Sequence, residues 1–272
     1  MSTIAKLGDR TVRWVEETGG LIRMAGMTQV GLLGGLFRLR GLRLLMRQMF
    51  LVGTCSLPVV MVTGAFVGMV LAAQSVRQFQ ILGLEGQLGA IVNLSVLREL
   101  GPVLAGVLLA GRVGCAIAAE LGTMRVTEQI DALRSMGSDP IRELVVPRYL
   151  ACLLLSPFLV LYADLLGVIG GYFVSVYGFG VDAAQYMRYA RNAVEFYDIF
   201  LGLFKSVFFG GSMALICCHK AFRCKPGAAG VGQACTEAFV ASCIVILGLD
   251  FVLNVVLNEI YIAIWGLRIS LI

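Results

Sequence analysis

Five long apolar runs dominate this sequence, and each is near or above the ~20 residues that cross a bilayer as a helix. The runs occur at about Leu51–Val76, Leu88–Ala119, Tyr149–Tyr177, Phe196–Cys218 and Ala238–Trp265. The composition agrees, because 58% of the residues are hydrophobic and only 14% are charged. The sequence therefore predicts an all-α polytopic membrane protein, with five transmembrane helices in one domain over residues 51–272.

The first fifty residues form a basic N-terminal segment and are not a sixth span. Val30–Leu45 mixes leucine and phenylalanine with several arginines, a pattern typical of an amphipathic helix that lies along the cytosolic leaflet. A flexible basic tail attracted to anionic lipid is the alternative. The first apolar run is too long for the h-region of a cleavable signal peptide.

Basic residues predict the orientation of the spans. With a cytosolic N-terminus, fifteen lysines and arginines fall in the cytosolic segments and four on the opposite side. Since cytosolic loops carry the excess of basic residues, we expect the N-terminus inside and the C-terminus outside.

Small residues recur every four positions on the second span and again on the first. Such stripes let another helix approach closely. They serve either packing within the chain or a dimer interface. The residues are Gly106, Ala110, Gly114 and Ala118, with Gly64 and Gly68 on the first span.

Charged residues inside the spans cost about 2.5–3.5 kcal/mol each on insertion scales, so they persist mainly where they are paired or line a wet cavity. Their depths predict a polar cluster of Arg112, Asp164, Lys205 and Asp250. In the plainer alternative these are structural ion pairs, such as Lys205 with Asp164 or with Asp250. Arg98 and Glu99 are neighbours on a helix and point about 100° apart, so we expect at least one of them to face a cavity or another subunit.

A polar segment separates the second and third spans. Residues 127–136 predict a short helix, with Thr127 as its cap and with Glu128 and Asp131 near its positive end. Ile130 and Leu133 share one face with Val126, which indicates a docking element for a cytosolic partner. The alternative is a loop helix that rests on the membrane.

No pattern in the sequence indicates a catalytic or metal site. None of the four lysines follows a phosphate-binding Gly-rich loop. The eight cysteines lack metal-ligand spacing with a histidine, and most lie in apolar runs, so we interpret them as small buried hydrophobes. We therefore expect neither enzymatic activity nor a nucleic-acid partner.

Several motifs occur in an order that closely resembles MlaE-like permeases, the membrane subunits of MCE-associated phospholipid ABC transporters. The resemblance covers roughly residues 45–260. The motifs that carry it are Arg98–Leu104 (RELGPVL), Ala110–Gly114 (AGRVG), Glu120–Met124 (ELGTM) and Val126–Leu133 (VTEQIDAL).

This resemblance implies a homodimer in a bacterial inner membrane that binds two cytosolic ATPase subunits and a periplasmic MCE-domain protein. Phospholipid would pass through a cavity at the dimer centre, near Arg98 and Glu99, with Leu71 and Leu100 as weaker candidates for acyl-chain contact. ATP and Mg would be bound by the ATPase, and this chain would hold no cofactor. An organelle envelope is the alternative location. The implied coupling residues are Thr127, Glu128, Ile130, Asp131, Leu133 and Arg134.

Two other classes of function fit the same residues. A proton-coupled secondary transporter would use Glu99, Asp164 or Asp250 as a relay and would need no ATPase. A non-transporting scaffold would use the small-residue stripes to anchor a complex, and Arg98 and Glu99 would then be dispensable for lipid handling.

Overall fold

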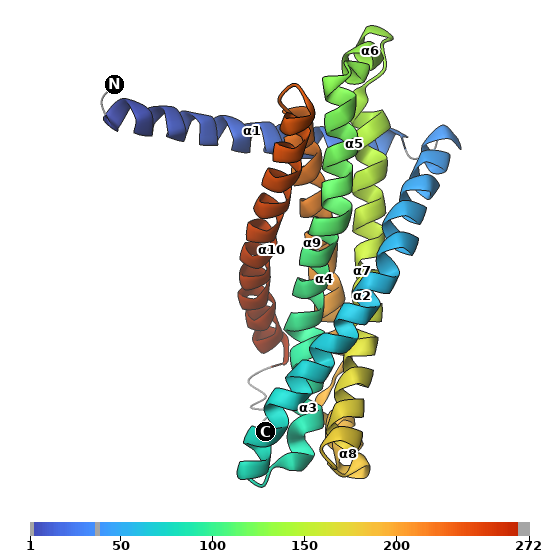
Figure 1. Ribbon diagram of the computed structural model, residues 1–272, viewed down its shortest axis with the longest axis vertical. Helices are drawn as coiled ribbons and strands as arrows, with labels where there is room; N and C mark the ends of the chain where they lie inside the picture. Colours follow the sequence, from blue (N-terminus) through green and yellow to red (C-terminus); the bar gives the residue numbers. More distant parts are fainter. Residues whose placement is uncertain (1–2, 36–38, 266–272) are drawn as a thin grey trace.

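The computed structural model describes residues 3–35 and 39–265, and in these ranges it consists of helices joined by short turns, without any strand (Figure 1). Five helical stretches are long and apolar enough to cross a membrane, so the predicted class and number of spans are confirmed. These stretches are Leu42–Ile81, Glu85–Val126, Ile141–Gly178, Phe196–Phe222 and Ala228–Ala263.

The first span lies within α2 (Leu39–Ile81), and the fourth and fifth are α9 (Phe196–Phe222) and α10 (Ala228–Trp265). The third is α7 (Val146–Phe173), which continues from a π-helical turn at Ile141–Val145 and ends in another at Val174–Gly178. Most spans extend beyond the predicted limits, because helical hydrogen bonding continues past the point where the sequence turns polar.

The second span is a rod built from three helices in series. It starts at a short 3-10 turn, Glu85–Gln87, and continues through α3 (Leu88–Ser95), α4 (Gly101–Leu109) and α5 (Cys115–Val126). Single π-helical turns, Val96–Leu100 and Ala110–Gly114, join these helices. The 42 residues of this stretch make a rod of about 63 Å, roughly twice the ~30 Å of bilayer hydrocarbon.

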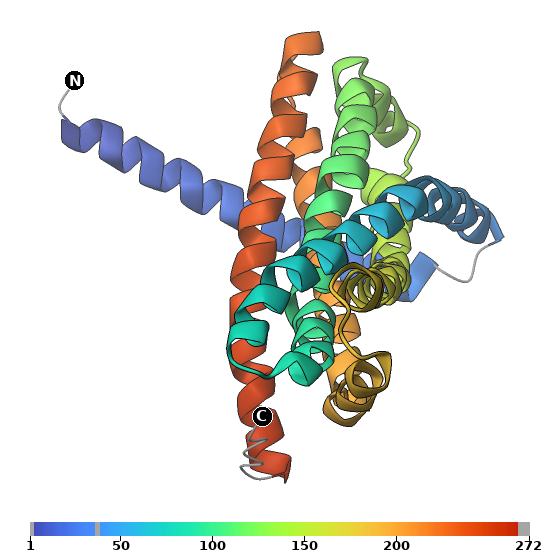
Figure 2. The same cartoon turned by 60° about the horizontal axis from the view of Figure 1, so that its bottom comes forward.

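The N-terminal helix α1 (Thr3–Gly35) lies across the bundle near the end that carries α6 (Gln129–Ser135) (Figures 1 and 2). This differs from the predicted helix over Val30–Leu45, because α1 starts much earlier and α2 already begins at Leu39; residues 36–38 of the predicted range lie outside the described residues. One face of α1 docks on the bundle, where Gly20 lies beside His219 and Gly31 lies beside Val146. The prediction followed the arginines at 38–47, several of which belong to the start of the first span.

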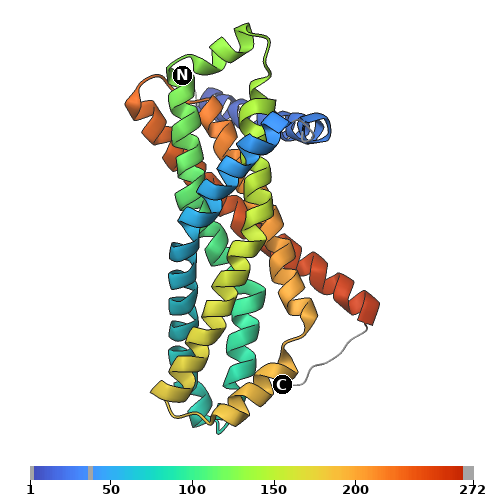
Figure 3. The same cartoon turned by 90° about the vertical axis from the view of Figure 1, so that its right-hand side faces the viewer.

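Glycines set the contact between α2 and α7, which cross closely (Figure 3). Gly64 lies against the backbone of Ala163, and Gly68 lies against the carbonyl of Gly167. A Cβ atom at either position would collide with backbone atoms that cannot move aside. This small-residue stripe therefore serves packing within the chain.

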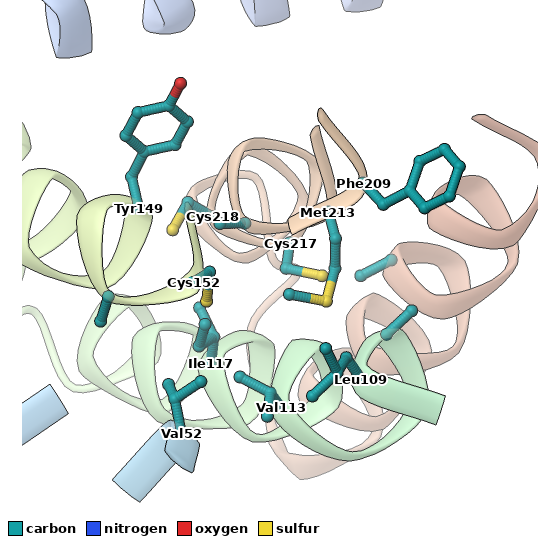
Figure 4. Close-up of a cluster of buried hydrophobic side chains, with 14 of the residues drawn as sticks. Val52, Leu109, Val113, Ile117, Tyr149, Cys152, Phe209, Met213, Cys217 and Cys218 are labelled. Atoms are coloured by element: carbon teal, nitrogen blue, oxygen red, sulfur yellow. The ribbon is translucent and has the colours of Figure 1, made fainter. Parts of the chain in front are cut away.

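The stripe on the second span also faces its own chain. Gly106 lies beside Phe209, and Gly114 lies beside Cys217, both on α9. The two alanines of this stripe are fully buried. Figure 4 shows the surrounding core, in which side chains of α4, α5, α7 and α9 interleave.

Cysteines take part in this core as small apolar side chains. Cys152, Cys217 and Cys218 are buried there, and all eight cysteines of the chain are free thiols. Among the residues that the structure describes, no group of three or more histidine, cysteine or acidic side chains is placed to hold a metal ion.

The end opposite α6 has a small core of its own. Helix α8 (Ala183–Ala193) folds back on α3, and its Tyr186 ring packs edge-on against Tyr172 with the ring centroids 5.5 Å apart. Burial raises the pKa of the Tyr186 hydroxyl to about 12. This hydroxyl therefore stays protonated at physiological pH, and the packing of α8 does not depend on its ionisation.

The contact between α2 and α7 yields a direct test. Replacing Gly68 by alanine should destabilise the fold by about 1–3 kcal/mol, because the new methyl group must push two helix backbones apart. Gly53→Ala is the matched control on the same helix, since a Cβ there meets only the ends of the Leu155 side chain, at 3.4 Å. The midpoint of thermal unfolding in detergent should fall for Gly68→Ala and stay near that of wild type for Gly53→Ala. Equal midpoints would contradict this account of the helix contact.

Candidate functional site

A proline inside the second span leaves one backbone carbonyl without its helical partner. Pro102 has no N–H group, so the carbonyl of Arg98 four residues earlier loses the hydrogen bond that a regular helix would give it. The chain forms the π-helical turn Val96–Leu100 at this place. Lys205 of α9 supplies the missing donor, with its Nζ 3.0 Å from the Arg98 carbonyl oxygen. Single π-helical turns often mark functional sites.

Lys205 is also the centre of an ion-pair cluster that joins three spans. Its side chain is 0% exposed, and Nζ lies 3.3 Å from Glu99 Oε1 and 3.0 Å from Asp250 Oδ1. Asn254 donates a hydrogen bond of 2.8 Å to Glu99 Oε2. A buried ammonium group is tolerated when its donors have partners; here the second span provides the Arg98 carbonyl and Glu99, and the fifth span provides Asp250. We call Glu99, Lys205, Asp250 and Asn254 the lysine cluster.

Arg98 points to a different partner from that of its neighbour. Its guanidinium lies 2.6 Å from Oδ1 of Asp198, which is fully buried in the first turn of α9. Asp198 also accepts a hydrogen bond from the backbone N–H of Glu195, so it caps the helix and binds the arginine at once. The Arg98 side chain stays 47% exposed. The two adjacent charges thus bind two separate places on α9, as their angular separation predicts.

The structure brings together only part of the predicted four-residue cluster. Lys205 pairs with Asp250, whereas Asp164 lies apart on α7 beside Gly101. Asp164 is buried, and its Oδ1 has no hydrogen-bond partner among the described residues. Arg112 lies in the second π-helical turn, Ala110–Gly114, where its side chain is exposed and unpaired within the described part of the chain. Counting residues from the span ends predicts depth in the membrane but not the direction in which a side chain points.

Two members of this site were not predicted, Asp198 and Asn254. Asp198 is the third residue after Glu195, which is the spacing of a capping box at a helix start. That spacing is a signal readable from sequence. Asn254 is uncharged and gives no such signal, because only its distance of four residues from Asp250 relates it to the cluster.

Leu71 and Leu100, the predicted acyl-chain contacts, lie on the first and second spans. Leu71 is half-buried on α2. Leu100 borders a crevice of about 10 Å³ between the first and second spans. That volume holds no more than a water molecule, so contact between these leucines and lipid remains a prediction.

The predicted helix over 127–136 is shorter and starts differently. Thr127 is not its cap, because the Thr127 hydroxyl donates to the carbonyl of Thr123 and so continues the last turn of α5. Glu128 follows with a left-handed φ of 60°, and α6 then runs over Gln129–Ser135. Asp131 joins α6 to the rod, because its Oδ2 lies 2.5 Å from Nη1 of Arg125 on α5. Its Oδ1 lies 3.2 Å from Nη1 of Arg134.

The apolar face of α6 points mainly toward the bundle. The sequence predicts instead that this face docks a cytosolic partner. Ile130 is fully buried, and Leu133 is half-buried. The surface left for a partner is formed by the exposed Thr127, Glu128 and Arg134, with Met136 at 71% exposure. We therefore expect Ile130 to anchor α6, since its side chain is out of reach of a partner.

Comparison with known proteins gives one consistent result. Residues 45–256 match the family model described as Permease MlaE. The chain is 43% identical over 219 residues to a probable ABC transporter permease protein of Rickettsia typhi, with 80% of this chain and 85% of that protein covered. It is 36% identical to the intermembrane phospholipid transport system permease protein MlaE of Haemophilus influenzae, with 93% of this chain and 97% of that protein covered. It is also 40% identical to the chloroplastic protein trigalactosyldiacylglycerol 1 of Arabidopsis thaliana, with 77% of this chain and 60% of that protein covered.

The lysine cluster is predicted to stabilise the folded protein, and substitutions can test this. Lys205→Met should destabilise the protein by about 3 kcal/mol, because it leaves two carboxylates facing each other without their cation. This value is at the low end for a buried pair, since the Glu99 side chain is 43% exposed. The triple variant Lys205→Met, Glu99→Gln, Asp250→Asn removes all three charges and should recover most of the lost stability in thermal unfolding. A single Lys205→Met variant as stable as wild type would contradict the structural role of the cluster.

Proposed function

Because this chain belongs to the MlaE permease family, we propose that it is the membrane subunit of an ATP-driven phospholipid transporter in an inner membrane. The name of the Haemophilus influenzae relative states phospholipid transport between membranes, and the name of the Rickettsia typhi relative states an ABC transporter permease. In this proposal the chain forms a homodimer around a lipid cavity. It binds cytosolic ATPase subunits and a periplasmic MCE-domain protein.

The observation that carries the proposal is the continuous rod from Glu85 to Val126. It holds Arg98 and Glu99 in one half and ends directly at α6. From Glu99 to Val126 the helical rise is about 40 Å. Asp131 fastens α6 to the rod through Arg125. A displacement imposed on α6 by a partner therefore has a stiff path to the charged groups.

Energy for this displacement would come from outside the chain. The sequence has no phosphate-binding Gly-rich loop followed by lysine, so ATP and Mg are assigned to the ATPase partner. The chain itself has no catalytic role in this proposal. Its task is to convert closure of the ATPase subunits into movement of the spans.

Unpaired charge at the surface of the spans supports an assembly larger than one chain. Arg112 is exposed within the second span and has no partner among the described residues, although an arginine facing lipid alone costs about 2.5–3.5 kcal/mol on insertion scales. Arg98 and Glu99 are each partly exposed as well. A second subunit with a polar cavity between the two copies would give these groups solvent or partners. Phospholipid head groups would then meet Arg98 and Glu99 at the cavity wall.

The lysine cluster joins the second, fourth and fifth spans. Lys205 binds the second span to the fourth and fifth spans, while glycine contacts bind the first span to the third. We propose that nucleotide-driven closure moves α6 and rocks the second and third spans, which Arg148 and Glu120 join by an ion pair of 2.8 Å. The cavity wall at Arg98 and Glu99 then shifts, and the bound lipid is released or admitted.

The orientation proposed from basic residues agrees with the arrangement of the ends. Helices α1 and α6 lie at one end of the bundle, and α10 runs from that end toward the other (Figure 1). Most lysines and arginines outside the spans belong to segments at the α1 and α6 end. We assign that end to the cytosol, with the C-terminus on the periplasmic side.

The surface of α6 gives the first test. Glu128→Lys should weaken co-purification of the ATPase several-fold while leaving the fold intact, because Glu128 is exposed and forms no ion pair within the described chain. The matched control is Glu143→Lys, which reverses another exposed acidic residue outside α6. Pull-down of the ATPase with each tagged variant measures the effect. Equal recovery from both variants would remove α6 from the proposed docking surface.

The energy source gives the second test. Purified complex in proteoliposomes should transfer a fluorescent phospholipid when ATP is added, and an imposed pH gradient without ATP should have no effect. Flux driven by the gradient would favour the secondary transporter. In that case Asp164→Asn is the variant to compare, because Asp164 is the buried carboxylate that no cation pairs with among the described residues.

A further inference from the structure

A cationic cavity lies at the α6 end of the bundle, away from the lysine cluster. It occupies about 390 Å³ between α1, the junction of α5 and α6, the start of the third span, and the end of α9. This size falls in the range of roughly 300–1,000 Å³ that is typical of small-molecule sites. About 21 Å of helix separates its residue His219 from Lys205 on α9. It is therefore a different place from the proposed transport cavity, and it does not depend on the proposed function.

Four arginines line this cavity: Arg23, Arg125, Arg134 and Arg223. Arg125 and Arg134 share one carboxylate, that of Asp131. Arg23 and Arg223 have no carboxylate partner among the described residues, and Arg223 donates only to the backbone carbonyl of Glu16. Glu17 is nearby on α1 but is bound to Lys220. The cavity therefore carries a surplus of positive charge.

His219 contributes a buried, unpaired polar atom to the wall of the cavity. Its side chain lines the cavity and is only 4% exposed, and its Nε2 has no hydrogen-bond partner among the described residues. Leaving a buried polar atom unpaired costs about 1–3 kcal/mol. A ligand with oxygen atoms would meet the guanidinium groups directly and would reach Nε2 only after rotation of the imidazole ring.

The remaining walls are apolar, and this limits the chemistry of the ligand. Met24, Met27 and Phe222 lie beside the arginines. Helix α1, which carries the two methionines, also exposes apolar side chains elsewhere, such as Val12, Val15 and Ile22. An amphipathic helix of this kind lies at the boundary of head groups and acyl chains. The cavity is then at the depth where lipid phosphates occur.

We propose that this cavity binds the phosphate group of an anionic phospholipid from the leaflet on the α6 side. Arginine binds phosphate oxygens through paired N–H donors, and the apolar walls fit the glycerol and the first acyl carbons. Residues of α1, α5, α6 and α9 all meet at the site, so the bound lipid holds α1 against the end of the rod. The lipid at this site is a fixed component, distinct from any lipid in transit.

Gly20 allows the cavity to be filled by one substitution. A Cβ atom at Gly20 would lie 2.8 Å from an Arg223 nitrogen and 2.9 Å from His219 Cε1. A Cβ atom at the adjacent Gly19 would have no such neighbour within 4 Å. Gly20→Leu therefore blocks the site, and Gly19→Leu is a matched control with the same change in helix propensity.

The test is native mass spectrometry of the purified assembly titrated with dioleoylphosphatidylglycerol. Dioleoylphosphatidylcholine serves as the neutral comparison, and sodium phosphate serves as the soluble competitor. Gly20→Leu and the double variant Arg23→Gln, Arg223→Gln should each bind phosphatidylglycerol about tenfold more weakly, the loss expected for one or two charge-assisted hydrogen bonds. Gly19→Leu should bind like wild type, and phosphatidylcholine should bind more weakly than phosphatidylglycerol throughout.

Three results would overturn the proposal. Equal phosphatidylglycerol affinity in all variants would remove the cavity as the binding site. Displacement by millimolar phosphate would mean that the site takes a soluble phosphate compound instead of a lipid. Loss of a protein subunit from the variants with unchanged lipid affinity would mean that the arginines bind an acidic partner. Size-exclusion profiles check that each variant is folded. If the double variant is misfolded, the single variant Arg23→Gln, at an exposed position, replaces it in the titration.

Discussion

Lys205 satisfies a constraint that the lipid environment imposes on the whole fold. In hydrocarbon there is no water to bind a freed carbonyl, so every such group must find a partner inside the protein. Pro102 frees the carbonyl of Arg98, and the buried ammonium of Lys205 binds it. The same ammonium needs carboxylates, and Glu99 and Asp250 provide them. One missing N–H thereby fixes the relative position of three spans.

Close backbone approach holds the rest of the bundle together by a different physical means. Between the described residues of α2 and α7 no ion pair fixes the register, and the hydrophobic effect gives little preference for helix over lipid. Glycine removes the side chain at Gly64 and Gly68, so the backbones meet and gain dispersion contacts along their length. Close packing is not confined to this pair, because Gly210 of α9 lies against the backbone of Cys152 on α7. The bundle thus combines charged junctions between spans with tightly packed ones.

The sequence predicts the fold class and the five spans because apolar runs of this length have few other uses. It predicts their ends poorly, since the helices continue into polar residues on both sides. Depth along a span is also predictable, but the direction of a side chain is not. The sequence therefore leaves both Asp164 and Asp250 as candidates for pairing with Lys205, and it wrongly groups Arg112 with a cluster that Arg112 does not touch. The residue type of Thr127 predicts a cap, whereas its hydroxyl donates back to a carbonyl of α5. The arginine cavity gives no signal in sequence, because its four arginines come from separate segments.

The length of the second span has a geometric consequence for any motion at its end. A rigid rod turns small rotations into larger displacements in proportion to its length. Over the roughly 40 Å between Glu99 and Val126, a tilt of about 5° moves the far end by about 3.5 Å. By the same proportion, a group about 5 Å from the point where Lys205 holds the rod moves by only about 0.4 Å. The energy of an ion pair varies inversely with its separation, so the charges beside Lys205 stay paired while the end of the rod at α6 moves by several ångströms.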